Sequence, residues 1–158
     1  MKKSLVAYFS ASGITGQLAK RLAQTIGADT FEIIPQVLYT QADLDWTDKQ
    51  SRSTLEMQDK NCRPPLAHPV PDMSKYDVVF VGFPVWWYRE PSIVDTFMES
   101  CHWKNQIVIP FATSGGSGLG DASQNMQALV PQVVVKDGKL WDVQADSLEL
   151  ASWAREYL

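Results

Sequence analysis

The sequence predicts an α/β fold in which helices cover both faces of a parallel β-sheet. Short apolar runs of strand length alternate with segments that have helical periodicity. The apolar run at 78–83, VVFVGF, is typical of a buried central strand. Strands that alternate with helices favour parallel pairing, because each crossover then contains a helix. With 158 residues, the chain is expected to form one domain, residues 1–158.

The first strand and the first helix have the clearest patterns in the N-terminal half. Residues 4–9 form a short apolar run that predicts a buried strand. A helix is expected over 14–27, because large apolar residues recur every four positions from Ile14 to Ile26 and so share one face. Residues 30–34 predict the second strand, which the following proline ends.

Residues 36–75 are the least regular part of the sequence. A helix is possible over 51–60, with Ser53 and Glu56 at the spacing of a capping box. Several prolines then favour an extended path. The segment is long for a connection between neighbouring strands, which suggests a functional cover or a partner surface.

The C-terminal half repeats the alternation of strands and helices. A turn signal at 136–139 favours a hairpin that adds a short extension through Val143. The expected strands and helices are 78–83, 91–100, 107–112, 121–129, 133–135 and a closing helix near 148–154.

Composition and charge exclude several classes of function. The net charge of −4 provides no basic face for nucleic acid. Cys62 and Cys101 have no metal-ligand spacing and are expected to be free thiols. The N-terminal apolar run is too short for a secretory signal, and no segment has the length of a membrane span. We therefore expect a cytoplasmic protein that neither binds nucleic acid nor inserts into a membrane.

Three turns follow predicted strands and should meet at one edge of the sheet. In such sheets ligands bind outside the carboxyl ends of the strands. Residues 10–15 combine hydroxyl side chains with a helix start and contain no Lys or Arg, which suits an anion held by neutral donors. Residues 84–90 are aromatic, and residues 113–118 are small enough for close backbone approach. Together they predict a site for a flat heterocycle that carries one phosphate.

These turns resemble the three flavin loops of the flavodoxin-like FMN-binding family, which includes small bacterial flavoproteins and FMN-dependent NAD(P)H oxidoreductases. The matching segments are Ser10-x-Ser12-Gly13-x-Thr15, Pro84-Val85-Trp86-Trp87 and Thr113-Ser114-Gly115-Gly116-Ser117-Gly118, in the same order along the chain. Arg63-Pro64 is similar to a further segment of some members. The resemblance implies three layers, with a five-stranded parallel sheet in the order 2-1-3-4-5.

The resemblance also implies which residues bind FMN. Hydroxyl and amide groups of the first turn would hold the phosphate, the rings of the second turn would flank the isoalloxazine, and amides of the third would meet its pyrimidine edge. It implies no catalytic side chain and no metal ligand. The expected cofactor-binding residues are Ser10, Ser12, Gly13, Ile14, Thr15, Pro84, Val85, Trp86, Trp87, Tyr88, Thr113, Ser114, Gly115, Gly116, Ser117 and Gly118.

Three functions are compatible with such a site. The first is an oxidoreductase that passes electrons from NAD(P)H through FMN to a quinone-like or other small acceptor. The second is a non-enzymatic electron carrier, and the third is a flavin-binding interaction module. Residues 84–91 contain no glycine, so positive φ at Trp87 or Tyr88 would be strained. Since carriers of this family use a glycine peptide that flips there, and since Arg89 balances Glu90, the enzyme is favoured.

The segment 36–75 has two interpretations. In a reductase it could roof the flavin, which would bring Tyr39, Trp46, Arg52 or Arg63 near the substrate. Alternatively it covers the sheet edge or forms a dimer contact. The resemblance to flavodoxin-like reductases suggests a homodimer.

Overall fold

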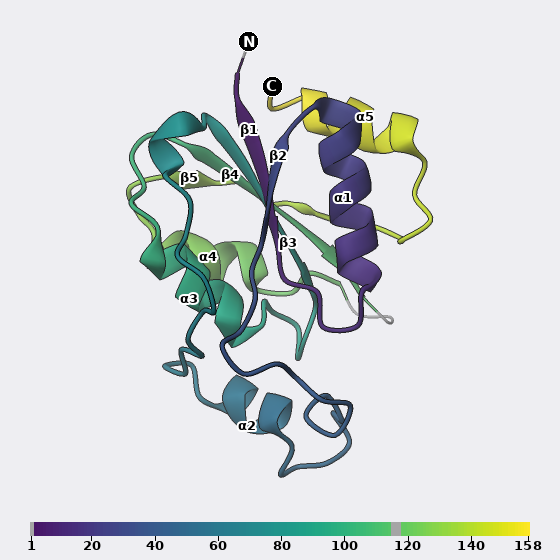
Figure 1. Cartoon of the computed structure of the whole chain (residues 1–158), viewed down its shortest axis with the longest axis vertical. Helices are drawn as coiled ribbons and strands as arrows, with labels where there is room; N and C mark the ends of the chain where they lie inside the picture. Colours follow the sequence, from purple (N-terminus) through teal and green to yellow (C-terminus); the bar gives the residue numbers. More distant parts are fainter. Residues whose placement is uncertain (1, 115–117) are drawn as a thin grey trace.

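The computed structural model describes residues 2–114 and 118–158, and it confirms the predicted α/β fold (Figure 1). All strand pairs are parallel, and the order β2-β1-β3-β4-β5 is the predicted one. A sixth strand also pairs with β4. The strands are β1 (Ser4–Tyr8), β2 (Asp29–Glu32), β3 (Val78–Pro84), β4 (Ile107–Thr113), β5 (Val134–Val135) and β6 (Lys139–Leu140).

Helices cover both faces of the sheet (Figure 1). Helices α1 and α5 pack on one face, and α3 and α4 on the other. The helices are α1 (Ile14–Ile26), α2 (Arg52–Gln58), the short 3₁₀ turn η1 (Met73–Lys75), α3 (Ser92–Ser100), α4 (Ala122–Leu129) and α5 (Ser147–Arg155).

The central strand β3 supplies both halves of the core. Val79, Val81 and Phe83 face α3 and α4, whereas Val78 and Phe80 face α1 and α5. All five side chains have no measurable exposure. Each such burial stabilises the fold by about 1.5–3 kcal/mol, so the strand is a rigid base for the turn that follows it.

The edge beyond β4 differs from the predicted hairpin. Strands β5 and β6 both run parallel to β4 and do not pair with each other. The N–H groups of Lys136 and Trp141 donate to β4 carbonyls on either side of Pro110, both at 2.8 Å. Pro110 has no N–H to offer in between, which accounts for the interrupted ladder. Gly138, at φ 81°, occupies the gap, where a Cβ would lie 2.4 Å from the Pro110 carbonyl oxygen.

The segment around α2 lies at the end of the molecule toward which the parallel strands run, away from both termini (Figure 1). Helix α2 is shorter than expected, and its N-cap is Ser51 rather than Ser53. The Ser51 hydroxyl accepts from the Thr54 N–H at 3.3 Å. Ser51 has extended backbone angles, so the helix begins one residue later and Ser53 already lies inside it.

Two further sequence expectations can be compared with the structure. Cys62 and Cys101 are free thiols, as predicted. Within residues 2–114 and 118–158, no helix is both long enough and apolar enough to cross a bilayer.

Candidate functional site

The three predicted turns leave the carboxyl ends of the adjacent strands β1, β3 and β4. Backbone hydrogen bonds tie these ends together. The Phe9 N–H donates to the Gly82 carbonyl, and the Val85 N–H donates to the Thr113 carbonyl, both at 2.9 Å. The sheet therefore brings all three turns to one edge, as the sequence predicts.

The first turn presents unpaired backbone donors at the start of α1. Gly13 adopts φ 91° immediately before the helix. The Ser10 hydroxyl accepts from the Gly16 N–H at 2.9 Å, so it caps the helix from inside the turn. Among the residues that the structure describes, the N–H groups of 12–15 have no acceptor. The first helical turn also contains no acidic residue. An anion could therefore bind here without competing with a carboxylate.

Thr15 connects the first turn to the third. Its hydroxyl lies 2.8 Å from the hydroxyl of Thr113, and both residues are buried. One hydroxyl donates to the other, which leaves one hydrogen of the pair available to a further acceptor. The sequence places these two residues in separate turns, and their direct contact is a finding of the structure.

The second turn has an unusual backbone. Trp86 and Arg89 exchange two backbone hydrogen bonds, at 3.1 and 3.2 Å, around Trp87 and Tyr88. These central residues have φ values of 47° and 63°, which defines a type I′ turn. Asn and Gly normally fill such positions, and other residues pay about 1–2 kcal/mol each for the left-handed conformation. The sequence predicts strain at positive φ in this glycine-free turn, and the structure adopts positive φ at both positions all the same.

Contacts from distant parts of the chain hold the strained turn in place. The Tyr88 carbonyl accepts from the Asp121 N–H, just before α4, at 3.0 Å. Gly120 packs against the same carbonyl so closely that a Cβ would lie 1.9 Å from its oxygen. On the other side, the Trp86 ring meets the edges of Phe9 and Tyr39, with centroids 5.6 and 5.5 Å away. Packing on both sides imposes the geometry that the local sequence disfavours.

The aromatic side chains of this turn differ in exposure. Pro84, Val85 and Trp86 are half-buried, whereas Trp87 and Tyr88 are 41% and 66% exposed. The two exposed rings could pack against a flat ligand, and Trp86 instead joins the turn to the core.

The third turn is described only in part. Thr113 is buried, Ser114 is half-buried and Gly118 is exposed. Gly115, Gly116 and Ser117 were also predicted to bind the cofactor, and they lie outside the described residues.

Part of the 36–75 segment reaches the second turn. Tyr39 contacts Trp86, and the Arg52 guanidinium lies 3.8 Å from the centre of the Tyr39 ring. Burial and the Glu56 carboxylate, which accepts from the Tyr39 hydroxyl at 2.5 Å, raise the pKa of Tyr39. Of the other two candidates, Trp46 is 73% exposed, and Arg63 pairs with Glu99 instead.

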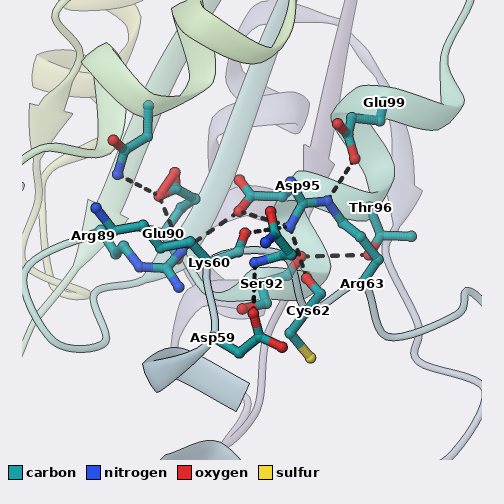
Figure 2. Close-up of polar contacts among 12 residues, drawn as sticks. Asp59, Lys60, Cys62, Arg63, Arg89, Glu90, Ser92, Asp95, Thr96 and Glu99 are labelled. Carbon is teal, nitrogen blue, oxygen red and sulfur yellow. Dashed lines mark hydrogen bonds and ion pairs between the residues drawn. The ribbon is translucent and has the colours of Figure 1, made fainter.

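A group of buried charges beneath the second turn was missed at the sequence level. The sequence indicates only that Arg89 balances the charge of Glu90. In the structure Glu90 is completely buried, and its Oε1 accepts from Asn125 Nδ2 at 3.2 Å (Figure 2). Asp95 is 5% exposed and lies 3.5 Å from the Arg89 guanidinium.

The environment shifts both carboxyl groups toward protonation. Burial, and then the charge of Asp95, raise the pKa of Glu90 to about 8. Burial also raises the pKa of Asp95 to about 6, although Arg63 and Arg89 oppose the shift. Buried acids with displaced pKa values and specific charge partners occur at functional sites as well as in structural ion-pair networks.

A parallel sheet in the order 2-1-3-4-5, with its turns gathered at one edge, defines the flavodoxin-like class of α/β fold. The sequence model of the flavodoxin family matches residues 3–157. The chain therefore belongs to the flavodoxin family.

Solved structures agree with this assignment. A candidate flavoprotein from Bacteroides uniformis ATCC 8492 is 41% identical, with 98% of both chains covered and a TM-score of 0.91. Another, from Bacteroides eggerthii DSM 20697, is 40% identical, with 99% of this chain and 98% of that chain covered and a TM-score of 0.93. A flavoprotein from Lactobacillus acidophilus NCFM, solved in complex with FMN, shares the fold at 21% identity. It covers 98% of this chain and 99% of its own, with a TM-score of 0.72. No curated protein matches the sequence.

Proposed function

We propose that residues 1–158 act as one domain that binds FMN at the edge formed by the turns after β1, β3 and β4. The unpaired N–H groups of 12–15 at the start of α1 carry this proposal. They provide several donors and a positive helix end, and the first turn of α1 contains no acidic side chain. The FMN complex of the Lactobacillus acidophilus relative supports the choice of ligand.

Each turn has a distinct role in this proposal. The amides of 12–15 and the hydroxyls of Ser12 and Thr15 bind the phosphate, while Ser10 and Thr113 orient the turn through their own hydrogen bonds. Trp87 and Tyr88 contact the ring system. Bound FMN would supply the redox chemistry, and the protein would bind it, orient it and limit its access to water.

We propose further that the protein is an oxidoreductase that takes electrons from NAD(P)H and delivers them to a quinone-like or other small acceptor. The two exposed aromatic side chains favour a site that small molecules can reach. The net charge of −4 provides little electrostatic guidance toward a basic protein partner.

A non-enzymatic electron carrier is the second candidate, and the backbone of the second turn removes one argument against it. Trp87 and Tyr88 already hold positive φ without glycine, so the absence of glycine is no longer an argument against a carrier. A flavin-binding module without turnover is the remaining alternative.

An anaerobic titration of the FMN-loaded protein separates these functions. An oxidoreductase should be bleached by NADH or NADPH and reoxidised by a quinone. A carrier should ignore both nucleotides and be photoreduced in two separate one-electron stages. A flavin-binding module should bind FMN, should not be reduced by NADH or NADPH, and should not show two separate one-electron stages on photoreduction. Protein that is isolated colourless and leaves the spectrum of added FMN unchanged would disprove flavin binding itself.

The placement of the phosphate has its own test. Replacing Ser12 and Thr15 together by alanine should weaken FMN binding by about 1.5–3 kcal/mol for each hydroxyl that bonds the charged phosphate. The affinity for riboflavin, which has no phosphate, should change much less. Equal losses for both ligands would mean that the phosphate binds elsewhere.

A further inference from the structure

We propose that the carboxyl groups of Glu90 and Asp95 share one proton, and that this proton stabilises the turn at Trp86–Arg89 in the geometry that binds the flavin. Glu90 is then a positioning residue, because it acts on the turn and not on the ligand. The part of the proposal that concerns ligand affinity rests on the proposed function, whereas the sharing of a proton does not.

The hydrogen bonds around the pair call for a proton. Glu90 Oε1 accepts from Asn125 Nδ2 at 3.2 Å. Glu90 Oε2 and Asp95 Oδ1 are both buried and have no donor among the described residues. Two ionised carboxylates can only accept, so both oxygens would stay unsatisfied. A proton on Glu90 would make this carboxyl group a donor, which the Asp95 carboxylate could accept, so that both buried oxygens gain a partner.

The balance of charge around the pair leads to the same conclusion (Figure 2). Arg89 lies 3.6 Å from Glu90 and 3.5 Å from Asp95. Arg63 lies 3.8 Å from Asp95 and 2.5 Å from Glu99. Two guanidinium groups therefore face three carboxyl groups, and one bound proton makes the cluster neutral.

Among the described residues, the remaining hydrogen bonds to the cluster come from neutral groups, and the charged side chain of Asp59 lies nearby (Figure 2). Helix α4 contributes the neutral Asn125. Lys60 and Cys62 face Arg63 through their backbone carbonyls, both at 2.8 Å. The end of α2 contributes the Met57 carbonyl, which accepts from Arg89 at 3.3 Å.

Arg89 connects the acid pair to the turn. Its backbone closes the two-residue turn by exchanging hydrogen bonds with Trp86. Its guanidinium donates to the Glu90 carbonyl at 3.2 Å and approaches Asp95. Loss of the shared proton would place a second buried negative charge under a turn that is already strained. Desolvation and mutual repulsion would then favour rearrangement of the turn.

The first experiment uses the protein without FMN. NMR titration of ¹³C-labelled carboxyl groups should show one group of this pair that titrates near pH 8. Folding raises the pKa of Glu90 from 4.5 in the unfolded chain to about 8. The protonated Glu90 therefore contributes its full share to the free energy of unfolding below pH about 4.5, and this contribution is lost as pH rises through about 8. Between pH 6 and 8, the folding constant of the parent should fall by up to about tenfold per pH unit relative to Glu90→Gln.

Two variants make this result specific. Glu149→Gln, at an exposed site on α5, should keep the pH profile of the parent. Asp95→Asn removes the charge that raises the pKa of Glu90, so the transition should move to lower pH. If Glu90→Gln fails to fold, the Asp95→Asn titration decides alone. Carboxyl titrations of the parent that all lie near pH 4.5, or a Glu90→Gln profile that overlays that of the parent, would refute the shared proton.

The second experiment measures FMN dissociation constants from pH 6.5 to 9. Glutamine stays neutral and can donate a hydrogen bond, as protonated glutamate does. The ratio of the parent's dissociation constant to that of Glu90→Gln should rise by at least about fivefold over this range, a usual size for coupling between sites. The ionisation of FMN itself cancels in the ratio. Parallel profiles would overturn the positioning role. If neither protein binds FMN at any pH, the proposed function fails, and the titration still decides whether the proton is shared.

Discussion

The turns after β1 and β3 both contain residues at positive φ, and they reach that geometry in different ways. In the first turn the residue is Gly13, at φ 91°, and no atom would lie within 4 Å of an added Cβ. In the second turn the residues are Trp87 and Tyr88, and contacts from Gly120 and Asp121 hold the backbone. The local sequence prefers the first geometry, whereas tertiary contacts impose the second.

The difference suggests different roles for the two turns. A turn that its own residues stabilise stays formed in the absence of a ligand and suits a fixed anion site. A strained turn held from outside can change when a contact or a charge beneath it changes. The buried acids lie under the second turn and not under the first.

The largest loss of stability is expected from disturbing the contact between Gly120 and the second turn. In Gly120→Ala the new Cβ would lie 1.9 Å from the Tyr88 oxygen, at a position with φ 58°. Overpacking and backbone strain together should lower the free energy of unfolding by about 2–4 kcal/mol, measured with urea. Gly118→Ala is the matched control, because its Cβ would meet no atom within 4 Å. Equal losses in the two variants would mean that the contact with Tyr88 does not hold the turn.

A smaller effect is expected in the first turn. Gly13→Ala meets no neighbouring atom, so only the strain of positive φ should appear. We expect a loss of about 1–2 kcal/mol in the free energy of unfolding. Gly13→Asn should recover part of the loss, since asparagine tolerates this region of φ. An unchanged free energy in Gly13→Ala would show that the turn can adopt another backbone at no cost.

The difference between geometry set by neighbouring residues and geometry imposed by distant contacts explains how much of the molecule the sequence could predict. The central strand at 78–83, helix α1 and the first turn follow from apolar periodicity and from glycine and hydroxyl residues within a few positions of one another. Local preferences and the final fold agree there, so pattern and structure coincide.

The features that escaped prediction depend on residues far apart in the chain. Buried Glu90 bonds to Asn125, its neighbour Asp95 pairs with Arg63, and the edge strand is split opposite Pro110. The backbone at Trp87 and Tyr88 depends on Gly120, which lies outside the turn. A single sequence gives no sign of these contacts, and at Tyr88 its local preference points the wrong way.

The hydroxyl pair that joins the first and third turns should show a non-additive effect. Thr15→Val leaves the buried Thr113 hydroxyl without its partner, which should cost about 1–3 kcal/mol of unfolding free energy. Thr113→Val should cost a similar amount. The double variant should lose little more than either single one, because no unpaired hydroxyl remains. Strictly additive losses in this double-mutant cycle would show that the two hydroxyls do not interact.

The smallest change in the free energy of unfolding is expected for a substitution of Tyr88, and this change should be a gain in stability. Its side chain is 66% exposed, so Tyr88→Gly removes little buried area, and glycine adopts φ 63° without strain. The strain relieved, about 1–2 kcal/mol, should outweigh the greater freedom of glycine in the unfolded chain, which costs roughly 0.5–1 kcal/mol. The variant should therefore unfold at slightly higher urea than the parent, while Gly13→Ala unfolds at lower urea. Its affinity for FMN should fall at the same time, because one exposed ring is lost from the site. A stability loss like that of Gly13→Ala would mean that Tyr88 is not strained, and that the two turns differ in composition alone.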